Sequence, residues 1–253
     1  MPALNLKSLS FQYDSDARSV FQDLTLDLDL GEIVCIVGPS GCGKTTLLNL
    51  IAGFLKPQSG SIVQRWRGQG VPHRLGYIFQ SDALLQWRTV GANIALAAEL
   101  RGVRPKVVEA EILRQLADFR LEPSILAKYP SELSGGMRQR ISLIQCLMAD
   151  PELLLLDEPF SSLDFFTKLK LEGDIRQLVR HGERAALFVT HDIDEAIAIG
   201  DRVVVMGRSG NGWQAEIRIA LEHRASLTPE EVRSHPQFGR YFAEVWKELR
   251  DAV

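Results

Sequence analysis

Apolar and polar residues alternate over residues 4–30 of the chain, with leucines at positions 4, 6 and 9 and again at 24, 26, 28 and 30. A period of two is typical of strands that bury one face and expose the other. Three later runs, residues 33–37, 153–156 and 185–189, are continuously apolar instead. Because strands of a parallel sheet are covered on both faces, such runs predict central strands of an α/β domain. We therefore expect an N-terminal antiparallel β subdomain followed by a mostly parallel sheet.

Shorter apolar runs predict further strands, and turn residues separate them. The additional strands are expected at residues 61–63, 75–79, 202–206 and 214–221. Residues with turn composition are 14–16, 56–60 and 207–212, and residues 64–74 predict an irregular hairpin.

Helical spacing dominates residues 89–150. Thr89 can cap a first helix, Pro105 suits the first turn of a second, and Ser134 can cap a third whose apolar face ends at Asp150. We expect these helices to form an α-helical subdomain inserted between two strands of the α/β domain.

The last part of the chain is also expected to be helical. A short helix is expected over residues 192–199, and Thr228–Glu231 has the pattern of a capping box with proline at the first helical position. A stripe at helical spacing then predicts a helix that packs on the domain; its members are Phe238, Phe242, Val245 and Leu249. We divide the chain into an α/β domain, residues 1–222, and a C-terminal helical extension, residues 223–253.

The composition is that of an ordinary globular protein, with 45% hydrophobic and 24% charged residues. A formal net charge of -3 argues against a general nucleic-acid binder, so no nucleic-acid partner is expected. No apolar run approaches the ~18 residues that span a bilayer, and no secretory signal is evident. Cys35, Cys42 and Cys146 lack metal-ligand spacing, and we interpret them as reduced thiols of a cytosolic protein.

One segment fits the phosphate-binding loop G-x-x-x-x-G-K-[ST]. Its residues are Gly38, Pro39, Ser40, Gly41, Cys42, Gly43, Lys44, Thr45 and Thr46. An apolar strand precedes the loop and helical spacing follows it, with Gly53 as a C-cap, which is the order that phosphate binding requires. Lys44 can reach the β- and γ-phosphates, and the Thr45 hydroxyl can ligate Mg²⁺. Modification of Cys42 is expected to block nucleotide binding.

Charged side chains follow two of the apolar runs. Asp157 and Glu158 come directly after residues 153–156, and His191 closes the run that begins at Ala185. Because α/β sheets bind ligands at the carboxyl ends of their strands, we expect these side chains to lie near the phosphate loop. Asp157 is expected to hold Mg²⁺ and Glu158 to face an attacking water. A lone strand-end histidine is usually structural, so the functional interpretation of His191 depends on this shared edge.

Two motifs have an ordinary structural interpretation beside the functional one. Ser134, Gly135 and Gly136 form either a second anion site at a helix N-terminus or an ordinary cap, and the cap is favoured on these residues alone. Tyr13 either stacks on adenine or, more often for such a residue, packs on its neighbours. Gln80 at a strand end is usually only a polar exit residue.

Leu84, Leu85 and Trp87 lie where the chain enters the helical insertion. They either pack the insertion on the core or line a groove in which a partner helix docks. The sequence leaves these two interpretations open.

Taken together, the motifs resemble the ATP-binding subunit of ABC transporters over about residues 4–222. The motifs follow the family order, with the phosphate loop, the signature Leu133–Gln139, the Walker B strand Leu153–Asp157 with Glu158, and Ser161–Asp164. Single residues also match family positions, with Tyr13 as the adenine-stacking aromatic, Gln80 as the Q-loop glutamine and His191 as the switch histidine. The resemblance implies the ABC ATPase fold, a phosphate-loop core with an inserted helical subdomain.

The resemblance also implies a mechanism that needs two subunits. A second copy, or a homologous ATPase subunit, would pack head to tail, so that Ser134, Gly135 and Gly136 of one chain close over ATP on the other. Glu158 would act as general base, Gln80 and Asp157 would help to hold Mg²⁺, and His191 would contact the γ-phosphate. Lys44 would complete this catalytic set, and Asp164 would link the two sites across the dimer.

The partners implied by the family are membrane permease subunits and, indirectly, an extracytoplasmic solute-binding protein. The expected location is peripheral, on the cytoplasmic face of the inner membrane. Residues 79–90 look most like the nitrate/sulfonate/taurine importer group, which implies import of a small solute. The sequence departs from that group at Gln86, where proline usually precedes the tryptophan.

Two alternatives remain beside an importer. A soluble ABC protein acting on ribosomes or DNA would usually carry two cassettes, long coiled coils or basic extensions, none of which this sequence has. The ATPase of an exporter is the alternative within transport.

Overall fold

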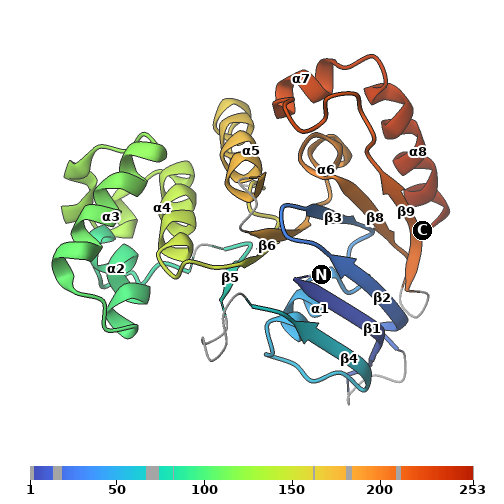
Figure 1. Ribbon diagram of the computed structural model, residues 1–253, viewed down its shortest axis with the longest axis horizontal. Coiled ribbons are helices and arrows are strands. Elements are labelled where there is room, and N and C mark those ends of the chain that lie inside the picture. Colours follow the sequence, from blue (N-terminus) through green and yellow to red (C-terminus); the bar gives the residue numbers. More distant parts are fainter. Residues whose placement is uncertain are drawn as a thin grey trace.

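Figure 1 shows a computed structural model of the chain. The structure describes residues 3–13, 19–66, 74–81, 83–161, 163–180, 184–208 and 212–252. The turn predicted at residues 14–16 lies outside the described residues, as do most of the hairpin predicted at 64–74 and the middle of the turn predicted at 207–212. Within the described part, no helix combines the length and the apolar character that crossing a bilayer demands.

The N-terminal alternation produces the predicted antiparallel sheet, in the order β2-β1-β4. Its strands are β1 (Leu4–Phe11), β2 (Phe21–Leu28) and β4 (Ser59–Gln64). β4 begins two residues earlier than the predicted start at Ser61. The reason is Gly60, whose φ of +85° and contact with β1 admit no side chain, since a Cβ there would lie 2.3 Å from the Ser8 carbonyl oxygen.

The second sheet has six strands in the order β5-β6-β7-β3-β8-β9, of which only β9 is antiparallel to its neighbour. The strands are β3 (Ile33–Val37), β5 (Leu75–Ile78), β6 (Leu153–Asp157), β7 (Ala185–Val189), β8 (Arg202–Met206) and β9 (Trp213–Arg218). All five residues of β3 are buried, alternately in the two hydrophobic clusters that cover the faces of this sheet. β9 ends at Arg218, earlier than the predicted Leu221.

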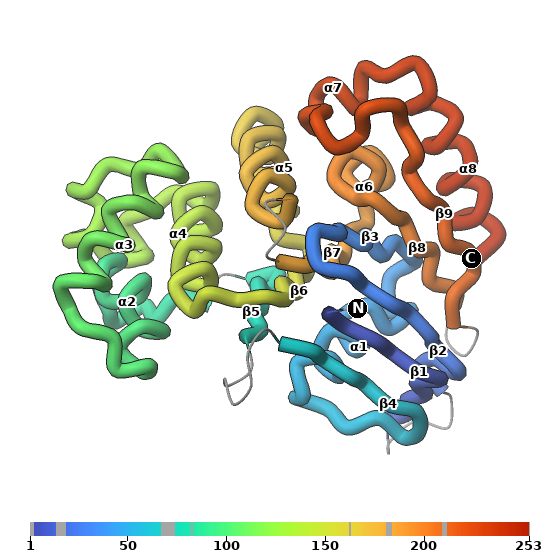
Figure 2. Tube along the Cα trace, in the orientation of Figure 1, coloured from blue at the N-terminus to red at the C-terminus, as the bar shows by residue number. Residues whose placement is uncertain are grey.

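Helices cover both faces of the six-stranded sheet (Figure 1). Helix α1 (Lys44–Ile51) shares one hydrophobic cluster with the antiparallel sheet. The other cluster includes residues of α5 (Phe165–Arg180), α6 (Ile193–Ile199), α7 (Pro229–Ser234) and α8 (Phe238–Asp251). Figure 2 shows the C-terminal segment returning over α6 to end beside β9. Helix α5 is an element that the sequence analysis did not predict.

The helical subdomain stands to one side of the sheets and is inserted between β5 and β6 (Figures 1 and 2). It contains α2 (Val90–Leu100), α3 (Pro105–Asp118), α4 (Gly135–Leu147) and two 3-10 turns, Pro123–Ala127 and Pro130–Glu132. The predicted caps are confirmed, because Thr89 Oγ1 accepts from the Ala92 N–H and Ser134 Oγ accepts from the Met137 N–H. Helix α4 ends at Leu147 and not at Asp150.

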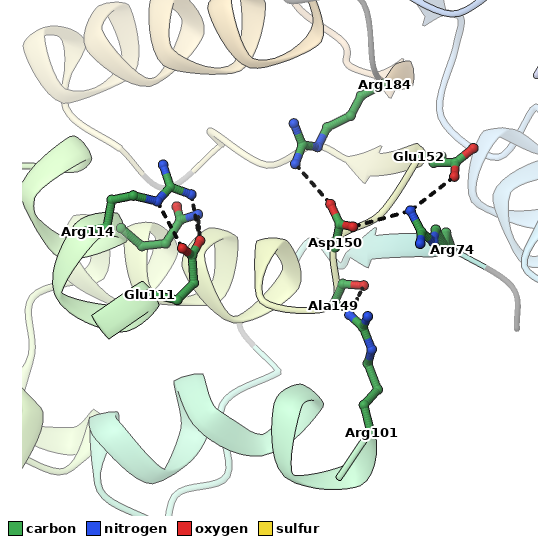
Figure 3. A network of polar contacts seen from close by, with 9 residues as sticks. Arg74, Arg101, Glu111, Arg114, Ala149, Asp150, Glu152 and Arg184 are labelled. Carbon is green, nitrogen blue, oxygen red and sulfur yellow. Dashed lines mark hydrogen bonds and ion pairs between the residues drawn. The ribbon is translucent and has the colours of Figure 1, made fainter. Parts of the chain in front are cut away.

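Polar contacts fasten the end of α4 to the core (Figure 3). Asp150, with a left-handed φ of +51°, accepts from Arg74 at 3.3 Å and from Arg184 at 3.4 Å. Arg101 donates to the Ala149 carbonyl at 2.9 Å. Arg74 and Arg184 directly precede β5 and β7, so these contacts lie at the amino ends of the parallel strands. The site described next lies at their carboxyl ends.

Candidate nucleotide site

The phosphate loop connects the buried strand β3 to helix α1. Gly41 and Gly43 have φ values of +78° and +106°, which a residue with a side chain rarely adopts. A Cβ on Gly38 would lie 2.7 Å from the Met206 carbonyl oxygen, so this position is sterically restricted as well. The loop therefore needs its glycines for close packing and for turning the backbone toward a ligand.

Lys44 opens helix α1 and is 9% exposed. Its ammonium donates to the carbonyl oxygens of Gly38, at 2.8 Å, and Pro39, at 3.0 Å. The Cys42 sulfur lies 3.9 Å from the same ammonium. Burial raises the pKa of the Cys42 thiol, and the side chain is almost fully covered, so thiol reagents are expected to reach it slowly.

A cavity of about 760 Å³ lies against the loop, large enough to hold a nucleotide. The residues that the sequence predicts for the chain's own part of the ATP site all line this cavity, except Pro39, Cys42 and Asp157. The lining residues are Tyr13, Ser19, Val20, Gly38, Ser40, Gly41, Gly43, Lys44, Thr45, Thr46, Gln80, Glu158 and His191. Ser19 and Val20 were not predicted, because neither belongs to a motif and only the fold brings β2 beside the loop.

Asp157 and Glu158 lie where β6 ends, as predicted. Asp157 is 5% exposed. Burial raises the pKa of its carboxyl, a hydrogen bond with the Thr45 side chain opposes that rise, and the neighbouring charge of Glu158 adds to it. A buried carboxylate in this position favours a nearby positive charge.

Glu158 is the point at which the predicted catalytic side chains meet. Its Oε2 accepts from Gln80 Nε2 at 3.1 Å, and His191 Nδ1 lies 3.1 Å from the same oxygen. Glu158 also has a φ of +45°, an uncommon conformation for a residue with a side chain. Three strand ends, those of β5, β6 and β7, thus bring Gln80, Glu158 and His191 together at one side of the pocket.

Tyr13 follows β1 at the mouth of the pocket. Its hydroxyl is 3.0 Å from the Thr46 hydroxyl, and its ring lies edge-on to Phe11 with 4.8 Å between centroids. The ring is 38% exposed. This arrangement leaves part of the aromatic surface available, and adenine stacking stays a prediction.

The signature residues do not line the pocket of their own chain. Ser134 caps α4, and a Cβ on Gly136 would lie 3.3 Å from Thr167 Cγ2, so the start of α4 packs beside the start of α5. Asp164 is exposed and caps α5 by accepting from the Thr167 N–H at 3.1 Å. The structure therefore does not place Ser134 in the pocket beside its own phosphate loop, and closure of the site by a second chain stays a prediction.

Leu84, Leu85 and Trp87, at the entry to the helical subdomain, differ in their exposure to solvent. Leu84 is buried in the core, Leu85 is half-buried and Trp87 is exposed. Leu84 therefore packs the subdomain on the core, and only Trp87 presents a large apolar surface to solvent. At the end of β5, Tyr77 and Phe79 form an aromatic stack with Phe54, in which Phe54 and Phe79 are exposed.

Comparison with known proteins tests the family predicted from the motifs. The family model described as "ABC transporter" matches residues 21–161, which include the phosphate loop, the signature and the Walker B strand. The chain belongs to the ABC transporter family. As an ABC ATPase, it is an ATP-binding and ATP-hydrolysing subunit, which confirms the predicted activity.

Curated relatives match this ABC ATPase along nearly its whole length. An uncharacterised ABC transporter ATP-binding protein of Bacillus subtilis is 37% identical over 98% of this chain and 96% of its own. The taurine import ATP-binding protein of Roseobacter denitrificans is 35% identical over 99% of this chain and 95% of its own. The protein of that name from Escherichia coli K12 is 38% identical, covering 89% of each chain.

Solved structures confirm the predicted ABC ATPase fold. A structure described as the ATP binding subunit of an ABC transporter has a TM-score of 0.77 and 26% identity, with 98% of this chain and 99% of that chain covered. A dimeric ATP-binding cassette bound to ADP and phosphate has a TM-score of 0.75 and 24% identity, and covers 87% of this chain and 100% of its own. This second likeness supports the fold alone.

Proposed function

We propose that this ABC ATPase powers import of a small solute, of the taurine, sulfonate or nitrate class, through separate membrane permease subunits. The names of the taurine-import relatives support the direction and the solute class. In this proposal the chain lies on the cytoplasmic face of the inner membrane, and a solute-binding protein delivers the solute on the other side. The solute itself would contact the permease and binding protein rather than this subunit.

The proposed hydrolytic roles rest on one observation, the convergence of Gln80 and His191 on Glu158 beside the phosphate loop. Glu158 would orient water for in-line attack on the γ-phosphate and accept its proton, a contribution of about 10²- to 10⁴-fold. His191 would contact the γ-phosphate. Lys44, now held by loop carbonyls, would turn to the β- and γ-phosphates.

Three residues in and beside the pocket supply oxygen donors that fit a magnesium ion. A hydroxyl from Thr45, a buried carboxylate from Asp157 and an amide oxygen from Gln80 are the oxygen donors that Mg²⁺ prefers. Among the described residues no cluster of three or more His, Cys, Asp or Glu could hold a metal. Bound there, Mg²⁺ would neutralise charge that develops on the phosphate oxygens.

The second ATPase subunit would complete the site. Ser134, Gly135 and Gly136 of that subunit would donate to the phosphates at the N-terminus of its helix α4, and Asp164 would link the two sites. Support comes from the placement of Ser134 outside its own chain's pocket.

The test of the hydrolytic roles is Glu158→Gln. This variant keeps the hydrogen-bonding shape of the side chain but cannot accept the proton. We expect ATP binding close to wild type and phosphate release slower by about 10²-fold or more. Near-normal turnover would remove Glu158 as the base.

The permease partner is tested at the exposed Trp87. We expect Trp87→Asp to reduce co-purification with the membrane permease while the isolated subunit still binds ATP. A charge at Leu84 would not discriminate, because that side chain is buried in the core. Unchanged co-purification of the Trp87 variant would move the docking surface away from this residue.

A further inference from the structure

A second, smaller cavity adjoins the hydrolytic residues. It measures about 140 Å³ and shares Glu158 and His191 with the nucleotide pocket, but none of the phosphate-loop residues. Its other walls come from the starts of α5 and α6 and from the segments that precede them, namely Phe160, Ser161, Leu163, Lys168, Thr190, Asp192 and Glu195. The proposed function assigns no task to the charged residues Lys168, Asp192 and Glu195.

Lys168 carries the positive charge of this group. Its ammonium lies 2.5 Å from Asp192 Oδ2 and 3.4 Å from Glu195 Oε1. The residue belongs to the first turn of α5, where its backbone N–H donates to the Asp164 carbonyl at 2.9 Å. Lys168 is therefore tied by its backbone to the segment that leads from Glu158, and by its side chain to the segment that contains His191.

Asp192 uses its two carboxylate oxygens for different partners. Oδ2 pairs with Lys168, and Oδ1 caps α6 by accepting from the Glu195 N–H at 3.2 Å. Its own backbone N–H donates to the Thr190 hydroxyl at 3.0 Å. The residues on both sides of His191 are thus bonded to each other, and Asp192 fixes the backbone from which the histidine projects.

Glu195 completes the ion pair from the first turn of α6. Its side chain is 4% exposed, and that of Lys168 is 20% exposed. A carboxylate and an ammonium that are shielded from water attract each other more strongly than a surface pair does. Burial raises the pKa of Glu195 to about 7, with the positive charge of Lys168 and a hydrogen bond from Thr190 opposing that rise.

We propose that Lys168 is a positioning residue that holds the start of α5 against residues 190–192 and so keeps Glu158 and His191 in contact. Lys168 does not contact the nucleotide pocket, because it lines only the small cavity on the other side of Glu158 and His191. This inference rests on the proposed roles of Glu158 and His191. It adds that an ion pair between the first turns of α5 and α6 is needed for Glu158 and His191 to act together.

The experiment starts with Lys168→Met, which removes the ammonium and retains an apolar chain. We expect kcat for ATP hydrolysis to fall about tenfold, because small displacements of reacting groups are costly. The KM for ATP and the Kd of a fluorescent ATP analogue are expected to change less than about twofold, since Lys168 does not touch the pocket. Lys168→Arg retains the charge and is expected to restore most of kcat.

Two further variants separate positioning from stability. Lys170→Met removes a lysine of similar exposure two residues along α5, outside the small cavity, and is expected to keep wild-type kcat. Asp192→Asn keeps a good N-cap for α6 but loses the charge that faces Lys168. It is expected to lower kcat as Lys168→Met does, and the double variant is expected to be no slower than either single one.

Unchanged kcat in Lys168→Met, alongside the expected loss in Glu158→Gln, would overturn the positioning role and leave the proposed function standing. A parallel loss of kcat and ATP affinity, or Lys168→Arg as slow as Lys168→Met, would overturn it too, because either result indicates a structural defect. If Lys168→Met does not fold, Asp192→Asn decides on the same criteria. Near-normal turnover in Glu158→Gln would instead contradict the proposed function itself.

Discussion

At the scale of single residues, Gly43 shows how strongly the phosphate loop depends on its backbone. Its φ is +106°, and an added Cβ would lie 2.5 Å from Val20 Cγ1. A left-handed conformation and a steric clash each disfavour a side chain there. The clash is with Val20, the residue beside the loop that no motif revealed.

We expect Gly43→Ala to lower the free energy of unfolding by about 1–3 kcal/mol and to weaken ATP binding. The weaker binding follows because the loop must move to relieve the contact with Val20. Urea unfolding and titration with a fluorescent ATP analogue measure the two effects.

Gly173→Ala is the matched control, since Gly173 lies within α5 and has no atom within 4 Å of an added Cβ. It is expected to raise the unfolding free energy by up to ~1 kcal/mol, because alanine is the better helix former. Wild-type stability and affinity in Gly43→Ala would mean that the loop accommodates the methyl group.

At the scale of elements, the packing of α5 on α6 buries charge. Glu195 of α6 faces Lys168 and Glu172 of α5 and lies near Asp192 at the start of its own helix. Glu172 is fully buried and accepts from both terminal nitrogens of Arg233 in α7, at 2.6 and 2.8 Å. These two carboxylates make the interface sensitive to protonation.

The pKa of Glu195 is raised from 4.5 to about 7. Since the folded value is the higher one, the stability that the protonated group contributes is fully present below pH 4.5 and is lost as pH rises through about 7. We therefore expect Glu195→Gln to become progressively more stable than wild type over this window, by at most about 3 kcal/mol. Urea unfolding at a series of pH values measures the difference.

Glu222→Gln replaces an exposed carboxylate and is the control for this series. It removes the same charge without changing the contact between Lys168 and Glu195. A Glu195→Gln stability difference that does not change with pH beyond that of this control would show that Glu195 titrates alike in the folded and unfolded states.

Most elements could be predicted because their signals are local. Caps at Thr89, Ser134 and Thr228 identify three helix starts from a few residues each, and the continuously apolar β6 and β7 need no distant context. Helix α5 could not be predicted in this way. Its buried face includes Glu172 and Arg176, two charged residues whose partners lie in the segment from Ala198 onward.

At the scale of the whole molecule, the phosphate loop and the signature lie at separate places in the chain. The pocket includes Lys44, and Ser134 lies outside it. The sequence predicts that Gln80, Glu158 and His191 lie together, because each follows a strand of the parallel sheet and the carboxyl ends of β5, β6 and β7 are neighbours. The contribution of Ser134 depends on a second chain, and no single-chain property tests it.

Mixing two inactive variants tests this division. Lys44→Ala disables the loop and Ser134→Arg blocks the signature, so each alone is expected to hydrolyse little ATP. In a head-to-tail dimer of one variant with the other, one site combines an intact Lys44 with an intact Ser134. Equal mixing is then expected to restore up to about one quarter of wild-type activity, measured as phosphate release.

The control is a mixture of the single variant Ser134→Arg with a double variant that carries both Ser134→Arg and Lys44→Ala. No dimer in that mixture contains an intact site, because every chain has the Ser134→Arg substitution. No recovery in the first mixture, with both variants folded and able to exchange partners, would contradict a site shared between chains. Recovery in the control mixture would contradict it as well.

The central position of β3 also has a consequence during translation. Ile33 pairs with Ala186, which the ribosome adds about 150 residues and ~10–30 s later. Until β7 and β8 emerge, the fully apolar strand that leads into the phosphate loop has no neighbour in its sheet. The nascent chain therefore completes the strand pairing around its phosphate loop only near the end of synthesis.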